Sequence, residues 1–105
     1  MTFVPVAEIS LASTGLINVT PQIPPSEGFE FIYRTATGVR WLTAERCFAP
    51  ARKAELTHAA WFEEIVAAAA GEYGVQLQIT PNTKWRDVPN DIRAEIESHA
   101  TRSAV

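Results

Sequence analysis

Residues 57–73, "THAAWFEEIVAAAAGEY", predict an amphipathic helix and thereby set the class of the fold. Thr57 is a suitable N-cap, Gly74 is a suitable C-terminal stop, and the four consecutive alanines have the highest helix propensity of any residue. One side of this helix carries His58, Phe62, Ile65, Val66, Ala69 and Tyr73. Because such a side must be covered by another layer, we expect the rest of the chain to supply a sheet.

The segment before the helix predicts a β-hairpin. Residues 29–35, "FEFIYRT", alternate between aromatic and other side chains, and "VRWL" at residues 39–42 follows a turn that would hold Gly38 in the left-handed conformation. This register places Arg34 opposite Arg40 on one face. The other face would carry Phe29, Phe31, Tyr33, Val39 and Trp41.

The remaining segments complete an α+β domain. Residues 3–12 and 16–23 alternate in the manner of a first hairpin, and Pro21 indicates that its second strand ends there or lies at an edge. Further elements are a short returning strand at "CF", a strand at 75–80 and a helix at 90–100. We therefore predict an antiparallel sheet in the order β-β-β-β-α-β-α, with the helices packed on one face of a single domain, residues 1–105.

Composition excludes several function classes. A formal charge of −3 argues against a nucleic-acid partner, and one cysteine permits neither an internal disulfide nor a metal site of several thiolates. The N-terminus lacks the basic residues and long apolar run of a secretory signal, and no segment is long enough for a membrane helix. We expect a cytoplasmic protein with no membrane association, no metal and no cofactor.

Cys47 is the first candidate for chemistry, because it follows Arg46 and precedes Arg52 and Lys53. Nearby cations lower the pKa of a thiol, and pairing with His58 would give the minimum equipment for thiol catalysis. The alternative is that Cys47 is buried, as free cysteines often are, and that His58 packs on the apolar side of its helix. The second interpretation is preferred, so no catalytic residue is assigned.

A basic hairpin around residues 34–47 is the second candidate. Arg34, Arg40 and Arg46 could gather there beside Trp41 to bind an anion or a small molecule. Residues 34–53 carry five basic side chains and one acidic one, whereas residues 55–72 carry four acidic and no basic side chains. The alternative is therefore that the acidic helix, another carboxylate or solvent neutralises these arginines.

Two tryptophans and the N-terminal strands are candidates for protein contacts. Trp61 and Trp85 would form an interaction surface if both were exposed, and otherwise would fill the core. Residues 3–23 contain Glu8 as their only formal charge, which is unusual for an unprotected sheet edge. This suggests that the protein partner could be a second copy, joined through the N-terminal strands.

Three fragments, "FIYRTATGVRW", "WFEEIVAAAAGEYGVQL" and "TKWRDVPNDIRAEI", resemble small proteins encoded in mobile integron gene cassettes. The resemblance covers residues 29–97 and leaves the first hairpin unmatched. It implies an accessory role in a bacterium and supplies no catalytic residue. The matching residues are Tyr33, Arg34, Gly38, Val39, Trp41, Trp61, Phe62, Glu72, Tyr73, Gly74, Thr83, Trp85, Val88 and Pro89.

These observations favour a small non-enzymatic binding or interaction protein without an established activity. The alternative is a small-molecule or anion-binding protein, with or without thiol catalysis, that uses the basic hairpin.

Overall fold

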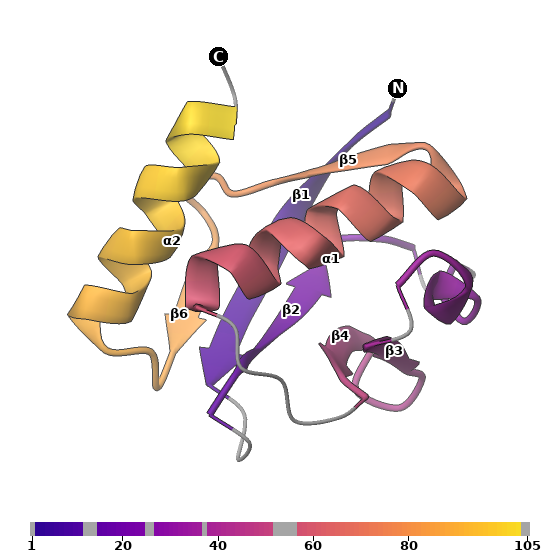
Figure 1. Cartoon of the computed structure of the whole chain (residues 1–105), viewed down its shortest axis with the longest axis horizontal. Coiled ribbons are helices and arrows are strands. Elements are labelled where there is room, and N and C mark those ends of the chain that lie inside the picture. Colours follow the sequence, from indigo (N-terminus) through magenta and orange to yellow (C-terminus); the bar gives the residue numbers. More distant parts are fainter. Residues whose placement is uncertain (1, 12–14, 25–26, 37, 52–56, 104–105) are drawn as a thin grey trace.

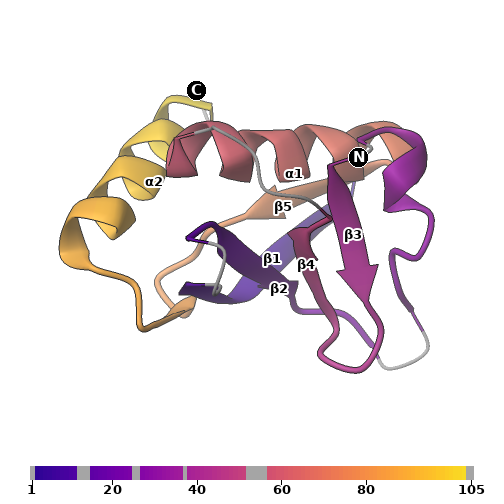
Figure 2. The same ribbon diagram turned by 60° about the horizontal axis from the view of Figure 1, so that its bottom comes forward.

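The computed structural model describes residues 2–11, 15–24, 27–36, 38–51 and 57–103. Its six strands form one mixed, mostly antiparallel sheet, and the two α-helices lie on the same side of that sheet (Figures 1 and 2). The predicted α+β class is confirmed. The elements are β1 (Thr2–Leu11), β2 (Ile17–Pro21), the 3-10 helix η1 (Ile32–Arg34), β3 (Val39–Leu42), β4 (Cys47–Pro50), α1 (His58–Tyr73), β5 (Val75–Gln78), β6 (Lys84–Arg86) and α2 (Asn90–Ser103).

The N-terminal strand β1 lies in the middle of the sheet. The strand order is β3-β4-β2-β1-β5, and β6 also pairs with β1. β1 is antiparallel to β2 but parallel to both β5 and β6. The expectation that residues 3–23 form a sheet edge is therefore wrong, because β1 and β2 each have neighbours on both sides. β2 does end at Pro21, as predicted.

A β-bulge in β1 keeps both halves of the strand facing the core. The register with β2 shifts between Val6 and Glu8. Val4 and Val6 are buried before the shift and Ile9 after it, so the extra residue restores the inward alternation. On the other side of β1, residues 2–5 pair with β5 and residues 8–10 pair with β6.

The side chain of Thr83 fills the gap between these two parallel pairings. Its Oγ1 donates a hydrogen bond to the Val6 carbonyl (2.6 Å) and accepts one from the Thr80 amide (2.9 Å). Thr83 is 6% exposed. A buried hydroxyl thus satisfies a strand carbonyl that neither β5 nor β6 reaches.

Helix α1 has the ends and the buried side that the sequence predicts. The Thr57 hydroxyl accepts a hydrogen bond from the Ala60 amide (3.1 Å), and Gly74 ends the helix at φ +65°. Trp61 is also buried, and its indole Nε1 donates to the Ile17 carbonyl on β2 (2.8 Å). This bond fixes α1 on the sheet. The sequence also predicts that Leu56, just before the N-cap, packs against Trp61, but Leu56 lies outside the described residues.

Residues 29–35 do not form the predicted strand. Phe29 and Ile32 are buried, three residues apart, and the amides of Thr35 and Ala36 both donate to the Ile32 carbonyl. That spacing suits a 3-10 turn and not a strand, whose inward residues are two apart. The predicted register of Arg34 opposite Arg40 therefore does not occur.

β3 instead pairs with the returning strand β4, so the "CF" prediction is confirmed and extended to Cys47–Pro50. Trp41 lies opposite Phe48, and Arg40 lies opposite Ala49. The left-handed residue of this hairpin is Arg46 at φ 55°, whereas Gly38 has no positive φ.

The segment after α1 supplies one element that the sequence analysis did not predict. Trp85 lies in the short strand β6, opposite Ile9 of β1, and not in a loop. The C-terminal helix α2 is confirmed, but it continues to Ser103. Its Glu95 carboxylate accepts a hydrogen bond from the Ala59 amide (2.7 Å) at the N-terminus of α1, which links the two helices.

We predict that Thr83→Val destabilises the fold by about 1–3 kcal/mol, because it leaves the buried Val6 carbonyl and Thr80 amide unsatisfied. Chemical denaturation followed by circular dichroism measures this free energy of unfolding. Thr2→Val is the matched control, since the Thr2 side chain is exposed on a strand. Equal stability of the two variants would contradict the proposed role of the hydroxyl.

We also predict that Gly74→Ala lowers the free energy of unfolding by about 1 kcal/mol. At a φ of +65° the Cβ atom of alanine lies too close to the neighbouring backbone carbonyl oxygen. Gly38→Ala is the control, since open space surrounds that position and its φ is not positive. Thermal unfolding of both variants measures the difference. A larger loss of stability for Gly38→Ala than for Gly74→Ala would contradict this prediction.

Candidate functional site

The arginines of the basic hairpin are held by different parts of the chain. Arg34 lies on η1, where its Nη1 is 3.9 Å from the Glu72 carboxylate at the end of α1. Arg40 is exposed on the edge strand β3. The Arg46 guanidinium donates to the carbonyls of Pro24 (2.7 Å) and Glu27 (2.9 Å). Arg34 thus has a protein carboxylate beside it, and Arg46 binds the backbone at Pro24 and at Glu27.

Trp41 is half-buried and belongs to an aromatic cluster. Its ring lies 5.2 Å from Phe29 and 5.1 Å from Phe48, both in edge-on contacts. Phe29 in turn lies 4.8 Å from Tyr73 of α1. The helix therefore does cover part of the aromatic surface of this region, although Phe31 and Tyr33 lie outside the cluster.

Cys47 and His58 are not arranged for thiol catalysis. Cys47 is 4% exposed, and burial raises the pKa of its thiol, with the charges of Glu45 and Glu8 as smaller causes in the same direction. Arg86 lowers this pKa, but less than burial raises it. His58 Nε2 forms a hydrogen bond with the Gly15 carbonyl (2.9 Å). A buried neutral thiol is a poor nucleophile.

The two candidate contact tryptophans have core positions. Trp61 is 1% exposed, so its ring cannot form a surface contact in the folded chain. Trp85 is half-buried and packs against the core, with the Arg93 guanidinium 5.1 Å from its ring centroid. Arg93 on α2 therefore covers the outer side of Trp85.

The exposed aromatic residues of η1 form the surface that the sequence analysis missed. Phe31 is 47% exposed and Tyr33 is 51% exposed, and their ring centroids are 6.5 Å apart. The Arg34 guanidinium stacks over Phe31 at 4.3 Å. We call Phe31, Tyr33 and Arg34 the aromatic patch. The alternation of residues 29–35 predicted a strand, and a strand would have turned the rings of Phe31 and Tyr33 toward the core.

The aromatic patch rests on a fixed support. Ile32, which lies between Phe31 and Tyr33 in the sequence, is fully buried. The Phe31 amide donates a hydrogen bond to the Tyr73 hydroxyl (2.9 Å). Thr35 Oγ1 donates to the Glu72 carboxylate (3.0 Å), which also lies beside Arg34. The end of α1 thus holds η1 at three points, and the rings project from this anchored turn.

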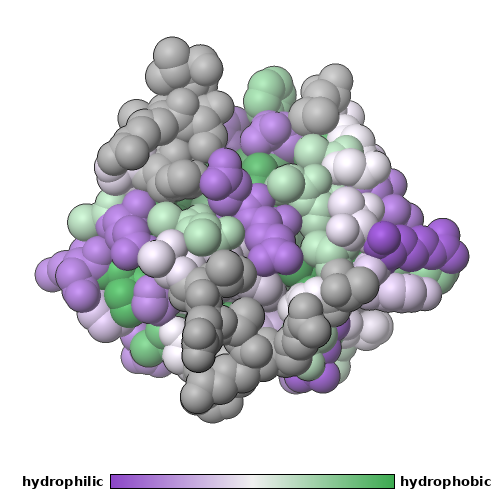
Figure 3. Space-filling model, viewed as in Figure 1, coloured by the Kyte–Doolittle hydropathy of each residue, from purple (hydrophilic) through white to green (hydrophobic). Residues whose placement is uncertain are grey.

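The other exposed large hydrophobic residues in the described part of the chain are Phe3 and Leu11 at the two ends of β1. On the face seen in Figure 3, outside the parts drawn in grey, hydrophobic residues form small groups separated by hydrophilic ones. Within the described ranges, no three His, Cys, Asp or Glu residues form a group that could hold a metal ion. No helix in the described part of the chain is long and apolar enough to cross a membrane.

Sequence and structure comparisons identify related proteins. A solved structure from the mobile metagenome of the North West Arm Sewage Outfall, integron cassette protein Hfx_Cass5, is 40% identical to this chain; the alignment covers 96% of this chain and 98% of that one, with a TM-score of 0.42. The comparison with curated proteins gives no significant match. Residues 6–83 match the integron cassette protein Hfx_Cass5 family, a range that includes the first hairpin, which the resemblance had left out. The chain therefore belongs to the Hfx_Cass5 family of integron cassette proteins.

Proposed function

We propose that this integron cassette protein is a small non-enzymatic binding protein that contacts a protein partner through the aromatic patch. The observation that carries the proposal is the half-exposure of Phe31 and Tyr33 on a turn whose central residue, Ile32, is fully buried. Large aromatic side chains that stay at the surface of a small protein are typical of interaction sites.

The composition of the patch supports a protein partner. Tyrosine and arginine are enriched among the residues that contribute most to binding energy at protein interfaces. Phe31, Tyr33 and the stacked Arg34 guanidinium lie side by side, and the Glu72 carboxylate near Arg34 keeps this cation in place. Because the support is held by hydrogen bonds to α1, binding would order few additional groups.

The sheet edges favour a different protein over a second copy. β3 and β5 have four residues each and β6 has three, and short edge strands resist pairing with another chain. Arg40 is exposed on β3, so antiparallel pairing of two β3 strands would bring like charges together. Self-association through β1 or β2 would require an edge that these strands lack.

The non-enzymatic part of the proposal rests on Cys47 and His58. The thiol is buried with a raised pKa, and the imidazole is engaged with the Gly15 carbonyl. We further propose an accessory role in the cytoplasm of the bacterium that carries the cassette, with residues 1–105 acting as one unit.

We predict that the paired substitution Phe31→Ala and Tyr33→Ala abolishes partner capture without loss of fold, since both rings are about half exposed. The test is affinity capture from a bacterial lysate followed by measurement of the affinity for the captured protein. Phe3→Ala is the matched control, because Phe3 is a 67% exposed phenylalanine on β1 and is not part of the aromatic patch. Equal capture by all three proteins, or capture by none, would contradict the proposal, and a concentration-dependent mass in sedimentation would favour a second copy.

We predict that Cys47 reacts with a thiol reagent much more slowly in the native protein than in denaturant, because it is 4% exposed. The raised pKa of Cys47 also predicts a pH dependence of stability. Above pH 9.0, the ordinary pKa of a cysteine thiol, the unfolded chain loses the thiol proton more readily than the folded chain. The free energy of unfolding should therefore fall with rising pH in this range by more in the wild type than in Cys47→Val. Rapid labelling of the native thiol at neutral pH would restore the thiol-enzyme alternative.

A further inference from the structure

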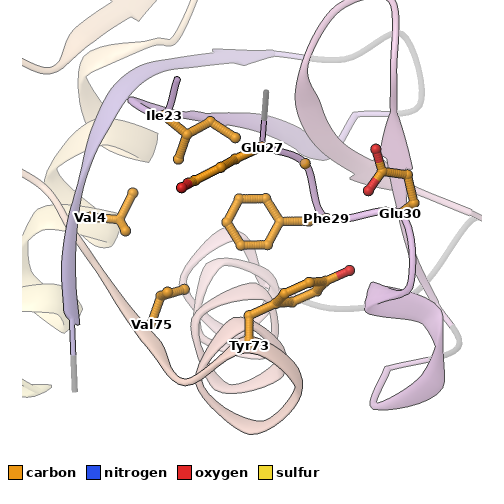
Figure 4. Close-up of a pocket in the computed structure, with 8 residues that line it drawn as sticks. Val4, Ile23, Glu27, Phe29, Glu30, Tyr73 and Val75 are labelled. Carbon is orange, nitrogen blue, oxygen red and sulfur yellow. The ribbon is translucent and has the colours of Figure 1, made fainter. Parts of the chain in front are cut away.

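A hollow of about 470 Å³ lies beside the segment that leads into η1. Its walls come from β1 (Val4), the end of α1 (Tyr73), β5 (Val75) and two residues between β2 and η1 (Ile23 and Phe29). Figure 4 shows these side chains around a common space. The volume is within the range of small-molecule pockets in proteins.

The hollow combines apolar and aromatic side chains with the polar groups of Glu27, Gly28 and Glu30. The rings of Phe29 and Tyr73 meet edge-on, with centroids 4.8 Å apart. Phe29 is otherwise packed against Trp41 and Phe48, so its position is fixed before any ligand arrives. A ligand that fits must therefore offer an apolar body to cover these side chains.

The charged residues of the hollow are both acidic. Glu27 and Glu30 line it, and in Figure 4 the Glu27 carboxylate points into the space beside Phe29. Within the described residues no cationic side chain forms an ion pair with either carboxylate. Arg46 approaches this segment, but it donates to the backbone carbonyls of Pro24 and Glu27.

This distribution of charge excludes an anion and favours a cation. Two carboxylates that form no ion pair within the described residues repel an anionic ligand and attract an ammonium group, and the net charge of −3 acts in the same direction. The half-buried ring of Tyr73 can add a cation–π contribution. The sign is opposite to that of the basic hairpin, which the sequence analysis had considered as a ligand site.

We propose that this hollow binds a small organic cation, in which an ammonium group is carried on an aliphatic or aromatic body. The apolar body lies against Val4, Val75 and the aromatic rings, and the ammonium group lies next to Glu27. This site is separate from the aromatic patch, so the proposal does not depend on the partner-binding function.

The test compares three probes of nearly equal size: 2-phenylethylamine, which is cationic at neutral pH, neutral 2-phenylethanol and anionic phenylacetate. Titrations monitored by NMR amide shifts give both the affinity and the site. We expect shifts around residues 27–30 and Tyr73 with the amine, at millimolar concentration or below. The alcohol should bind about fivefold more weakly, and phenylacetate more weakly still.

Glu27→Gln should weaken amine binding about fivefold and leave binding of the alcohol unchanged, because it removes the charge and retains the shape. Glu45→Gln is the matched control, since Glu45 is an exposed carboxylate in the turn between β3 and β4. The paired Phe31→Ala and Tyr33→Ala variant should bind the amine like the wild type. The proposal is overturned if the amine does not bind, or if the alcohol or phenylacetate binds as tightly as the amine. It is also overturned if Glu27→Gln and Glu45→Gln change the affinity for the amine equally.

Discussion

The fold depends on the fact that one side of β1 pairs with two different parallel strands along its length. β5 pairs with the first residues of this strand and β6 with the last, and the Thr83 hydroxyl satisfies the Val6 carbonyl between them. The bulge at the same place turns Val4, Val6 and Ile9 toward one core. Without these two pairings the segment after α1 could not return along β1, and α2 would have no fixed position from which Glu95 could reach the N-terminus of α1.

The segment from residue 27 to residue 36 connects this frame to both proposed binding features. Phe29 and Ile32 anchor the segment in the core, while Tyr73 and Glu72 at the end of α1 bind its backbone and side chains. Because the anchors are three residues apart, the residues between and after them must project outward. The aromatic patch and the position of Glu30 beside the hollow are therefore consequences of a single 3-10 turn.

Local sequence signals predicted both α-helices and most of the strands, and missed the 3-10 turn and β6, which depend on distant partners. The caps of α1, Thr57 and Gly74, act within one turn of the helix, so they could be recognised without the fold. β6 could not be recognised without the fold, because a three-residue strand forms only where β1 offers a side that no other strand occupies. The alternation of residues 29–35 favoured a strand, but burial of Phe29 and Ile32 determined the outcome. Of the candidate site residues, Cys47 could be interpreted from residue type alone, whereas the positions of Trp61, Arg34 and Arg46 depended on partners distant in the sequence.

The residues that carry the resemblance to integron cassette proteins can now be separated by what the fold requires of them. Trp61 bonds to β2, Thr83 bridges β1, and Gly74 ends α1 in a conformation that other residues adopt at a cost. Tyr33 differs from these, since its ring is 51% exposed and contacts the equally exposed Phe31. An exposed tyrosine contributes little to the stability of a small domain, so packing within the described chain gives Tyr33 no role, whereas the proposed contact with a protein partner does.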